Sequence, residues 1–221
     1  MELASGALFR DANIKGYWRL ESDGADSSGN GKTLSAVGSP TYVPGQYGNA
    51  VRLPTITDNL TRADAFGVEG GACSIVAWIK QETEIASSSV NFIQHNSATI
   101  NNGNSISYEY NAGTRRLYFR RSKWNVAHEG PYYNVALGTG WNHIVYTYDG
   151  TNVRGYLNGV LVAGPTAASG NGSGAPTAAL TLVPNPSGAC RFDDVAIFNR
   201  ALSLAEVESL YRGNPNFFQM F

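Results

Sequence analysis

Several features that mark particular protein classes are missing from this 221-residue sequence. No run approaches the roughly 18 consecutive apolar residues that a membrane-spanning helix needs, so we expect no membrane insertion. Neither sign of charge dominates, with 16 basic and 17 acidic residues, which argues against nucleic acid as a partner. The two cysteines, Cys73 and Cys190, permit one disulfide, but two buried free thiols fit the sequence equally well.

The N-terminal segment lacks a basic leader followed by an apolar stretch of about seven residues or more. The sequence therefore predicts no Sec signal peptide. We expect an extracellular or virion-surface location, reached either after removal of a signal or by another route.

Residues 141–163 form the most informative segment of the chain. Its three apolar-rich runs are separated by Asp149-Gly150 and Asn158-Gly159, dipeptides that readily adopt the positive-φ type I′ turns of tight hairpins. The segment therefore predicts three consecutive antiparallel strands. Apolar residues cover both faces of the first strand, which is typical of a strand inside a sandwich.

Short strand candidates, separated by Gly, Asn, Pro and Ser, recur along the rest of the chain. The clearest are residues 15–20, 50–53, 73–81, 90–95, 105–110, 116–120, 178–183 and 191–198. Their spacing predicts an all-β fold, a two-sheet antiparallel jelly-roll sandwich in one domain. One short C-terminal helix is predicted, because Ser203 and Glu206 form a capping-box pattern and Gly213 can end the helix. Residues 164–176, rich in Gly, Ala and Ser, predict a loop.

Five sequence blocks, taken in order, resemble a known family. They are GYWRLESDGADSSGNGKTL, GQYGNAVRL, CSIVAWIK, WNHIVYTYDGTNVRGYLNGVLVA and FDDVAIFNRALSLAEVESLYRG. They resemble the laminin G-like, concanavalin A-like jelly-roll family, in its bacterial and phage branch, over about residues 15–213 of the single domain 1–221. The resemblance leaves residues 1–14 and 214–221 as extra segments. It is less specific for function, because this fold carries lectins, glycan-binding modules, adhesion modules and virion components.

The resemblance also implies a structural calcium ion. In the family, the SSGNG loop and the Asp of the last strand often lie around calcium, which carries over here to Asp26, Asn30 and Asp193 or Asp194. Carboxylate, amide and backbone carbonyl oxygens are the ligands that Ca²⁺ prefers. The alternative is that the loop is only a turn and that Asp194 accepts backbone hydrogen bonds where strands cross.

The sequence predicts no catalytic activity. Retaining glycosidases need two carboxyl groups about 5 Å apart, and glucanases of this fold place them on alternate residues of one strand. Glu21 and Asp23 begin such an alternation, but Gly24 and Ala25 follow. The three histidines are isolated in the sequence, and no G-x-S-x-G motif accompanies them.

Aromatic residues close to a turn predict a glycan-binding site. Sugar rings present C–H faces that stack on aromatic side chains, while a few polar groups hold the hydroxyls. The candidate ligand-binding residues are Trp124, His128, Tyr132 and Tyr133. The alternative is an aromatic hairpin packed on a sheet edge.

Other aromatic and basic residues have different expected places. We assign Trp18, Trp78 and Trp141 to the core, and expect Tyr108 and Tyr110 to line the concave sheet. The basic residues gather at Arg115, Arg116, Arg120, Arg121 and Lys123. They alternate along a predicted strand, which favours a solvated strand face, and contact with an acidic partner is the alternative.

Two functions from different classes remain. The first is a non-catalytic recognition module that binds a glycan or surface polysaccharide at a cell or particle surface. The second is a structural virion component, such as a phage capsid decoration or tail protein, that assembles with other virion or appendage subunits through its termini. That alternative depends on apolar residues of the C-terminal tail, which need cover from water: Phe217, Phe218, Met220 and Phe221.

Overall fold

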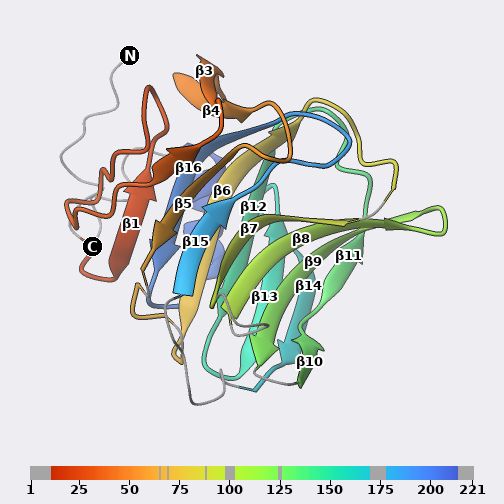
Figure 1. The fold of residues 1–221 in the computed structure, drawn as a ribbon. Helices are drawn as coiled ribbons and strands as arrows, with labels where there is room; N and C mark the ends of the chain where they lie inside the picture. The colour runs from red at the N-terminus through yellow and green to blue at the C-terminus, as the bar shows by residue number, and fades with distance from the viewer. Residues whose placement is uncertain are drawn as a thin grey trace.

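The computed structural model describes residues 11–64, 66–68, 70–87, 89–97, 103–123, 126–169 and 178–213. Within these ranges the chain forms sixteen strands and one short helix, arranged as two antiparallel sheets that face each other (Figure 1). The predicted two-sheet, all-β sandwich is confirmed. No helix in the described ranges is long and apolar enough to span a membrane.

Sheet A contains eight strands in the order β14-β13-β12-β6-β16-β4-β3, with β1 paired to β16. They are β1 (Ile14–Trp18), β3 (Thr41–Pro44), β4 (Asn49–Leu53), β6 (Cys73–Gln81), β12 (Asn142–Tyr148), β13 (Asn152–Leu157), β14 (Val160–Ala167) and β16 (Cys190–Phe198). The predicted meander is therefore the run β12-β13-β14 at one side of this sheet.

Sheet B also contains eight strands, in the order β10-β9-β8-β7-β15-β5-β2, with β11 paired to β9. They are β2 (Ser35–Val37), β5 (Asn59–Ala63), β7 (Ser89–Ser97), β8 (Gly103–Asn111), β9 (Thr114–Lys123), β10 (Val126–Glu129), β11 (Tyr132–Asn134) and β15 (Ala178–Leu182). The strands that the sequence pattern missed are β2, β3, β5, β10 and β11, each of five residues or fewer.

The core lies between the two sheets. Tyr146 from β12 and Phe119 from β9 are fully buried there, together with Trp18 from β1. A second, smaller cluster lies on the outer side of sheet A, where Val145 packs with Val207 of the helix α1 (Leu204–Tyr211). α1 begins with the predicted capping box between Ser203 and Glu206.

The two turns of the meander differ in type. Asn158 and Gly159 both have positive φ, 51° and 80°, as a type I′ turn requires. At the other turn only Gly150 has positive φ, and the Asp149 carboxylate accepts hydrogen bonds from the amides of Thr151 and Asn152. The type I′ prediction was therefore wrong at Asp149-Gly150, where the side chain of Asp149 organises a three-residue loop instead.

Three further expectations need correction. Trp141 is only half-buried, because it lies just before β12, whereas Trp18 and Trp78 are buried as predicted. Tyr108 lies in the core and stacks on Phe92 between the sheets, and Tyr110 packs against the same core, so neither lines an outer face.

β14 extends to Ala167, which places strand where residues 164–167 of the predicted loop were expected. Residues 170–177 of that loop lie outside the described ranges. Cys73 and Cys190 are both buried and do not form a disulfide with each other, and burial raises the pKa of Cys190 to about 12.

Candidate functional site

β9 carries different residues on its two faces, because successive side chains of a strand point to opposite sides. Leu117 and Phe119 are fully buried in the core. Arg116, Tyr118 and Arg120 alternate with them and lie partly exposed on the outer side of sheet B. Aromatic and cationic side chains therefore share the outer face of this strand.

The predicted basic cluster is split by the same alternation. Arg121 faces inward and is fully buried, with its guanidinium 3.7 Å from the centre of the Tyr148 ring and 2.7 Å from Asn104 Oδ1. Arg115 also lies on the inward side and donates to the carbonyl of Ile85. The expected solvated face therefore holds for Arg116 and Arg120 and is wrong for Arg121.

β11 adds a second tyrosine to this face. Tyr132 lies opposite Tyr118 in the strand register, so both side chains are on the same side, with ring centroids 5.3 Å apart. Tyr132 is 50% exposed. Tyr133 lies opposite Leu117 and is 38% exposed on the other side of β11. The structure therefore separates two residues that the sequence placed in one site.

The two arginines lie over the tyrosine rings. The Arg120 guanidinium is 4.1 Å from the centre of the Tyr118 ring, and that of Arg116 is 5.1 Å from the centre of the Tyr132 ring. Arg120 also forms an ion pair of 3.2 Å with Glu109 of β8. We call Glu109, Arg116, Tyr118, Arg120 and Tyr132 the Tyr–Arg face. Cation–π contacts of this kind hold the rings and guanidinium planes in fixed relation.

Polar side chains continue the Tyr–Arg face across the neighbouring strands. Ser107 is fully buried and donates to Asn91 Oδ1 at 2.6 Å, and the exposed Asn91 donates from Nδ2 to Gln94 Oε1 at 3.2 Å. Ser105 lies opposite Arg120 in the register of β8 and β9. The outer side of sheet B thus combines aromatic planes with amide, hydroxyl and guanidinium groups.

The remaining ligand-binding predictions are not placed by the structure. Trp124 lies outside the described ranges, and His128 belongs to β10 but its side chain is not described. Sequence reasoning placed neither Glu109 nor Tyr118 in a site, and it considered Arg116 and Arg120 only as an alternative contact for an acidic partner. The alternation Arg-x-Tyr-x-Arg over residues 116–120 is the signal that could have found three of them.

The predicted metal residues Asp193 and Asp194 lie where β16 changes its partner. Phe192 lies opposite Val51 of β4, whereas Val195 lies opposite Trp18 of β1. The pairing with β6 is interrupted at this point, and Asp194 has a φ of 47°, which is unusual for a residue with a side chain. The junction thus creates room for two adjacent carboxyl groups, which we call the acid pair.

The acid pair is buried and incompletely satisfied. Asp193 Oδ2 accepts hydrogen bonds from the amides of Gln46 and Tyr47 at 2.8 and 3.0 Å, while Asp193 Oδ1 is buried with no partner among the described residues. Asp194 Oδ1 accepts from the Tyr17 hydroxyl at 2.5 Å. The bonds to backbone amides that the sequence assigned to Asp194 are therefore made by Asp193.

Burial is the main cause of the raised pKa of both carboxyl groups. Burial and the charge of Asp194 raise the pKa of Asp193 to about 8, and burial raises the pKa of Asp194 to about 6. At neutral pH the two carboxyl groups therefore favour sharing a proton or a bound cation over two free negative charges.

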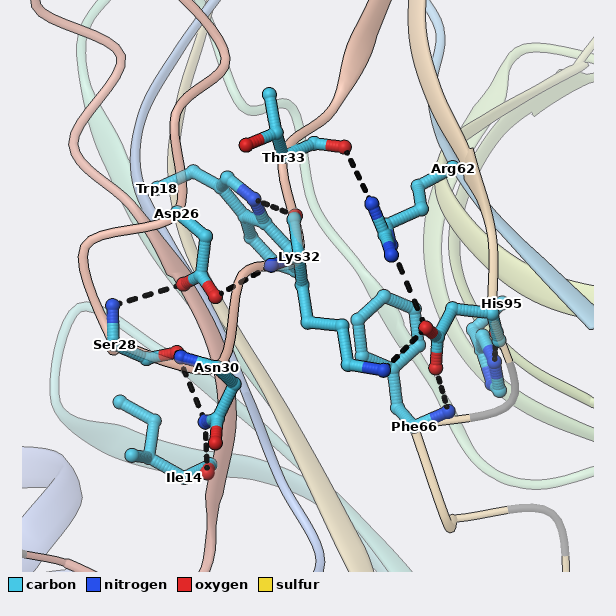
Figure 2. Close-up of polar contacts among 11 residues, drawn as sticks. Ile14, Trp18, Asp26, Ser28, Asn30, Lys32, Thr33, Arg62, Phe66 and His95 are labelled. Atoms are coloured by element: carbon cyan, nitrogen blue, oxygen red, sulfur yellow. Dashed lines mark hydrogen bonds and ion pairs between the residues drawn. The ribbon is translucent and has the colours of Figure 1, made fainter.

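The predicted loop residues Asp26 and Asn30 use their polar atoms within the loop and on the backbone of β1 (Figure 2). Asp26 accepts hydrogen bonds from the amides of Tyr17 and Ser28 at Oδ1 and from that of Lys32 at Oδ2. Asn30 Nδ2 donates to the Ile14 carbonyl and to Ser28. Although burial favours the neutral form, hydrogen bonds from the loop hold the pKa of Asp26 below its ordinary value.

Tyr17 connects the two predicted halves of the metal site. Its amide donates to Asp26 and its hydroxyl donates to Asp194. In the described parts of the chain, no three His, Cys, Asp or Glu side chains are grouped closely enough to hold a metal ion by themselves. A cation at the acid pair would therefore also need oxygen atoms from the backbone or from amide side chains.

The sequence matches the family model described as the concanavalin A-like lectin/glucanases superfamily over residues 45–208. The chain belongs to this superfamily. The matched range lies within the span over which the sequence blocks resembled the family, and it includes every strand of the two sheets except β1, β2 and β3. Comparison with curated proteins gave no significant match.

Solved structures with the same fold are binding domains. The binding domain of botulinum neurotoxin DC in complex with SialylT matches with a TM-score of 0.73 at 16% identity, covering 91% of this chain and 52% of that one. A structure of botulinum neurotoxin type C, whose cell entry depends on interaction with two ganglioside molecules, matches with a TM-score of 0.69 at 18% identity and the same coverage.

A third similar structure is domain 4 of AbnA, an extracellular arabinanase from Geobacillus stearothermophilus, in complex with arabinotriose. Its TM-score is 0.65 at 19% identity, with 91% of this chain and 100% of that chain covered. This chain spans about half the length of the neurotoxin domains, at 52%. These likenesses establish the fold.

Proposed function

We propose that the chain is a non-catalytic glycan-binding module that holds sugar rings on the Tyr–Arg face. The observation that carries the proposal is the exposed Tyr132 ring beside Tyr118, bordered by the planar side chains of Arg116 and Arg120. Aromatic rings stack on the C–H faces of sugars, and the nearby guanidinium, carboxylate and amide groups can hydrogen-bond to hydroxyls. Burying Tyr132 against a sugar would also cover an exposed apolar ring.

The similar proteins support a glycan as the ligand class. The arabinanase domain is described with arabinotriose, and the neurotoxin type C structure is described with gangliosides. The arabinanase domain is the more direct support, because this chain covers 100% of that domain but only 52% of the neurotoxin chain. We propose an extracellular location on the same basis, since the arabinanase is described as extracellular.

The chemistry of the face supports binding without catalysis. Hydrolysis of a glycosidic bond uses a pair of carboxyl groups on either side of the bond. Among the described residues of β8 and β9, Glu109 is the carboxylate on the outer face, and it is paired with Arg120. The Tyr–Arg face therefore offers stacking and hydrogen bonds but lacks the second acid on these strands.

The test compares two neighbouring tyrosines that point to opposite sides of β11. The purified protein is applied to a glycan array, and the Kd of each hit is measured for the wild type, Tyr132→Ala and Tyr133→Ala. We expect Tyr132→Ala to weaken binding at least about tenfold, as loss of a central aromatic contact does, and Tyr133→Ala to leave it unchanged. Equal Kd values for the wild type and Tyr132→Ala, or no hit at all, would contradict the proposal.

We also propose that a structural calcium ion binds at the acid pair. The supporting observation is the buried, unpartnered Asp193 Oδ1 next to Asp194, because an orphaned buried carboxylate oxygen is costly unless a proton or cation compensates it. When bound, the ion would neutralise these charges at the junction of β1, β4 and β16. Asp26 and Asn30 would support it indirectly by holding the loop that contacts Tyr17.

Thermal unfolding tests the calcium proposal independently of glycan binding. A ligand at 100 times its Kd stabilises the folded state by about 2.7 kcal/mol, so Tm should rise with calcium and fall with a chelator. Asp193→Asn should abolish this shift, whereas Asp26→Asn should reduce stability without removing the response to calcium. An unchanged Tm across calcium and chelator would contradict the proposal.

The virion alternative remains a prediction. It depends on Phe217, Phe218, Met220 and Phe221, which lie outside the described ranges. If the chain assembles through this tail, deleting residues 217–221 should abolish incorporation into particles and leave a folded protein.

A further inference from the structure

Positive charge exceeds negative charge on the Tyr–Arg face. Arg120 is paired with Glu109 at 3.2 Å, which leaves Arg116 as the second arginine of the face. Glu109 is opposite Arg116 in the strand register, but its carboxylate is not within ion-pair distance of that guanidinium. Two guanidinium groups thus share one carboxylate among the described residues of this face.

Arg116 is held in place by weak partners. Its guanidinium lies 5.1 Å from the centre of the Tyr132 ring, and Nη1 donates to the Tyr118 hydroxyl across a long distance of 3.4 Å. Its Nε is buried and has no hydrogen-bond partner among the described residues. A guanidinium carries five donors arranged in a fork that fits an anionic group with two parallel oxygens. Because Nε is covered by surrounding atoms, it is the terminal amino groups of Arg116 that remain for a ligand, while the two tyrosine side chains restrict the position of the guanidinium.

We infer that the glycan recognised by the Tyr–Arg face is acidic, and that its carboxylate or sulfate group is bound by Arg116 while a sugar ring stacks on Tyr132. This inference rests on the proposed glycan-binding function and names the class of glycan. The Arg116 guanidinium covers one face of the Tyr132 ring, so a sugar stacked on the other face can extend a substituent past the ring edge to the guanidinium. Charge complementarity decides between acidic and neutral sugars here, because Glu109 already serves Arg120.

The experiment measures Kd for pairs of glycans that differ in charge. The probes are polygalacturonate with its carboxyl-reduced form, and dextran sulfate with dextran. The two pairs distinguish a carboxylate from a sulfate as the anionic group. We expect the wild type to bind the acidic member of at least one pair about tenfold more tightly than the neutral member, a typical effect of one charge-assisted contact.

Three variants assign the preference to Arg116. Arg116→Gln should weaken binding of the acidic member more than binding of the neutral member, and so remove the preference. Arg212→Gln, which removes the same charge from an exposed position in the turn after α1, should keep the preference and so excludes a general effect of net charge. Tyr132→Ala should weaken binding to both members, because it removes the stacking surface.

The outcomes separate the two proposals. Equal affinity of the wild type for both members of each pair, with loss of binding in Tyr132→Ala, would overturn the acidic-ligand inference and leave the glycan-binding function standing. A preference that survives in Arg116→Gln would also overturn it. Absence of binding to every probe and to the glycan array would overturn both proposals.

Discussion

Two aromatic surfaces of this protein lie on opposite outer sides of the sandwich. One is exposed to water, and the other is covered by α1. The Tyr–Arg face on sheet B is open, with Tyr132 50% exposed. On sheet A, Trp78 is only 5% exposed because Tyr211 of α1 stacks on it at 5.7 Å and His143 lies 5.0 Å away. We call Trp78, His143, Tyr211 and the adjoining Tyr47 the Trp78 cluster.

Covering a surface also changes the pKa of the ionisable groups beneath it. Arg116 and Arg120 are partly exposed to water, whereas burial lowers the pKa of His143 to about 3. Aromatic composition is similar on the two sides, so the presence of aromatic residues does not by itself indicate a binding site. The helix converts one surface into a part of the folded core and leaves the other available to a ligand.

The largest expected effect follows from removing the centre of the covered surface. Trp78→Ala deletes a buried side chain that contacts residues from β12, α1 and the loop before β4. We expect a loss of about 3–5 kcal/mol in the free energy of unfolding, as for other buried aromatic residues. Urea unfolding followed by circular dichroism measures it. A loss below about 1 kcal/mol would show that α1 does not hold this cluster closed.

Lowering the pH should destabilise the folded protein through His143 of the Trp78 cluster. The pKa of His143 is about 3 in the folded protein and about 6.5 when exposed, so the unfolded state binds the proton first as pH falls. The contribution of His143 to stability is therefore fully present above pH 6.5 and decreases towards pH 3, by about 2 kcal/mol at pH 5.

The comparison with His143→Phe isolates this contribution. Phe keeps the contacts with Trp78 and Tyr211 but cannot titrate, and other titrating groups cancel in the difference between the two proteins. The free energies of unfolding should diverge as pH falls below 6.5, in favour of the variant. Parallel curves from pH 7 to 4 would show that water or a proton reaches His143 in the folded state.

The smallest expected change in stability concerns the open surface. Tyr132→Ala removes an exposed ring, and surface substitutions of this kind usually alter the free energy of unfolding by less than about 0.5 kcal/mol. The same urea titration checks it, so that any loss of glycan binding in this variant reflects the missing ring. A destabilisation similar to that of Trp78→Ala would mean that Tyr132 is a structural residue, and would remove the contrast between the two surfaces.

The sequence was sufficient for the long elements of this fold because their patterns are local. The bounds of β6 were predicted at Cys73 and Gln81, and Asn158-Gly159 and the Ser203 capping box marked real chain reversals and helix starts. The short strands β10 and β11 have three or four residues each, which is too few to show the alternation of apolar and polar residues that marks a strand. Their pairing depends on β9, which no local pattern reveals.

The candidate sites were harder to predict because they depend on register and on chain crossings. Tyr132 and Tyr133 are adjacent in sequence, and only their pairing with Tyr118 and Leu117 shows that they face opposite ways. The family resemblance pointed to Asp193 and Asp194. Asp193 is the one that accepts hydrogen bonds from the amides of Gln46 and Tyr47, and this follows from the change of partner along β16. Such contacts join residues about 150 positions apart and leave no periodic trace.

β9 lies near the margin of sheet B, where a ten-residue strand would offer a long row of unpaired amides and carbonyls. β10 pairs with its end at Lys123 and Arg121, and β11 pairs with it from Tyr118 to Arg116. The chain turns between them at Gly130, where φ is 128° and a Cβ atom would meet the Phe119 carbonyl. These two short strands occupy the backbone positions at which another polypeptide could add, so they protect the protein against edge-to-edge aggregation and leave its side chains to make contacts.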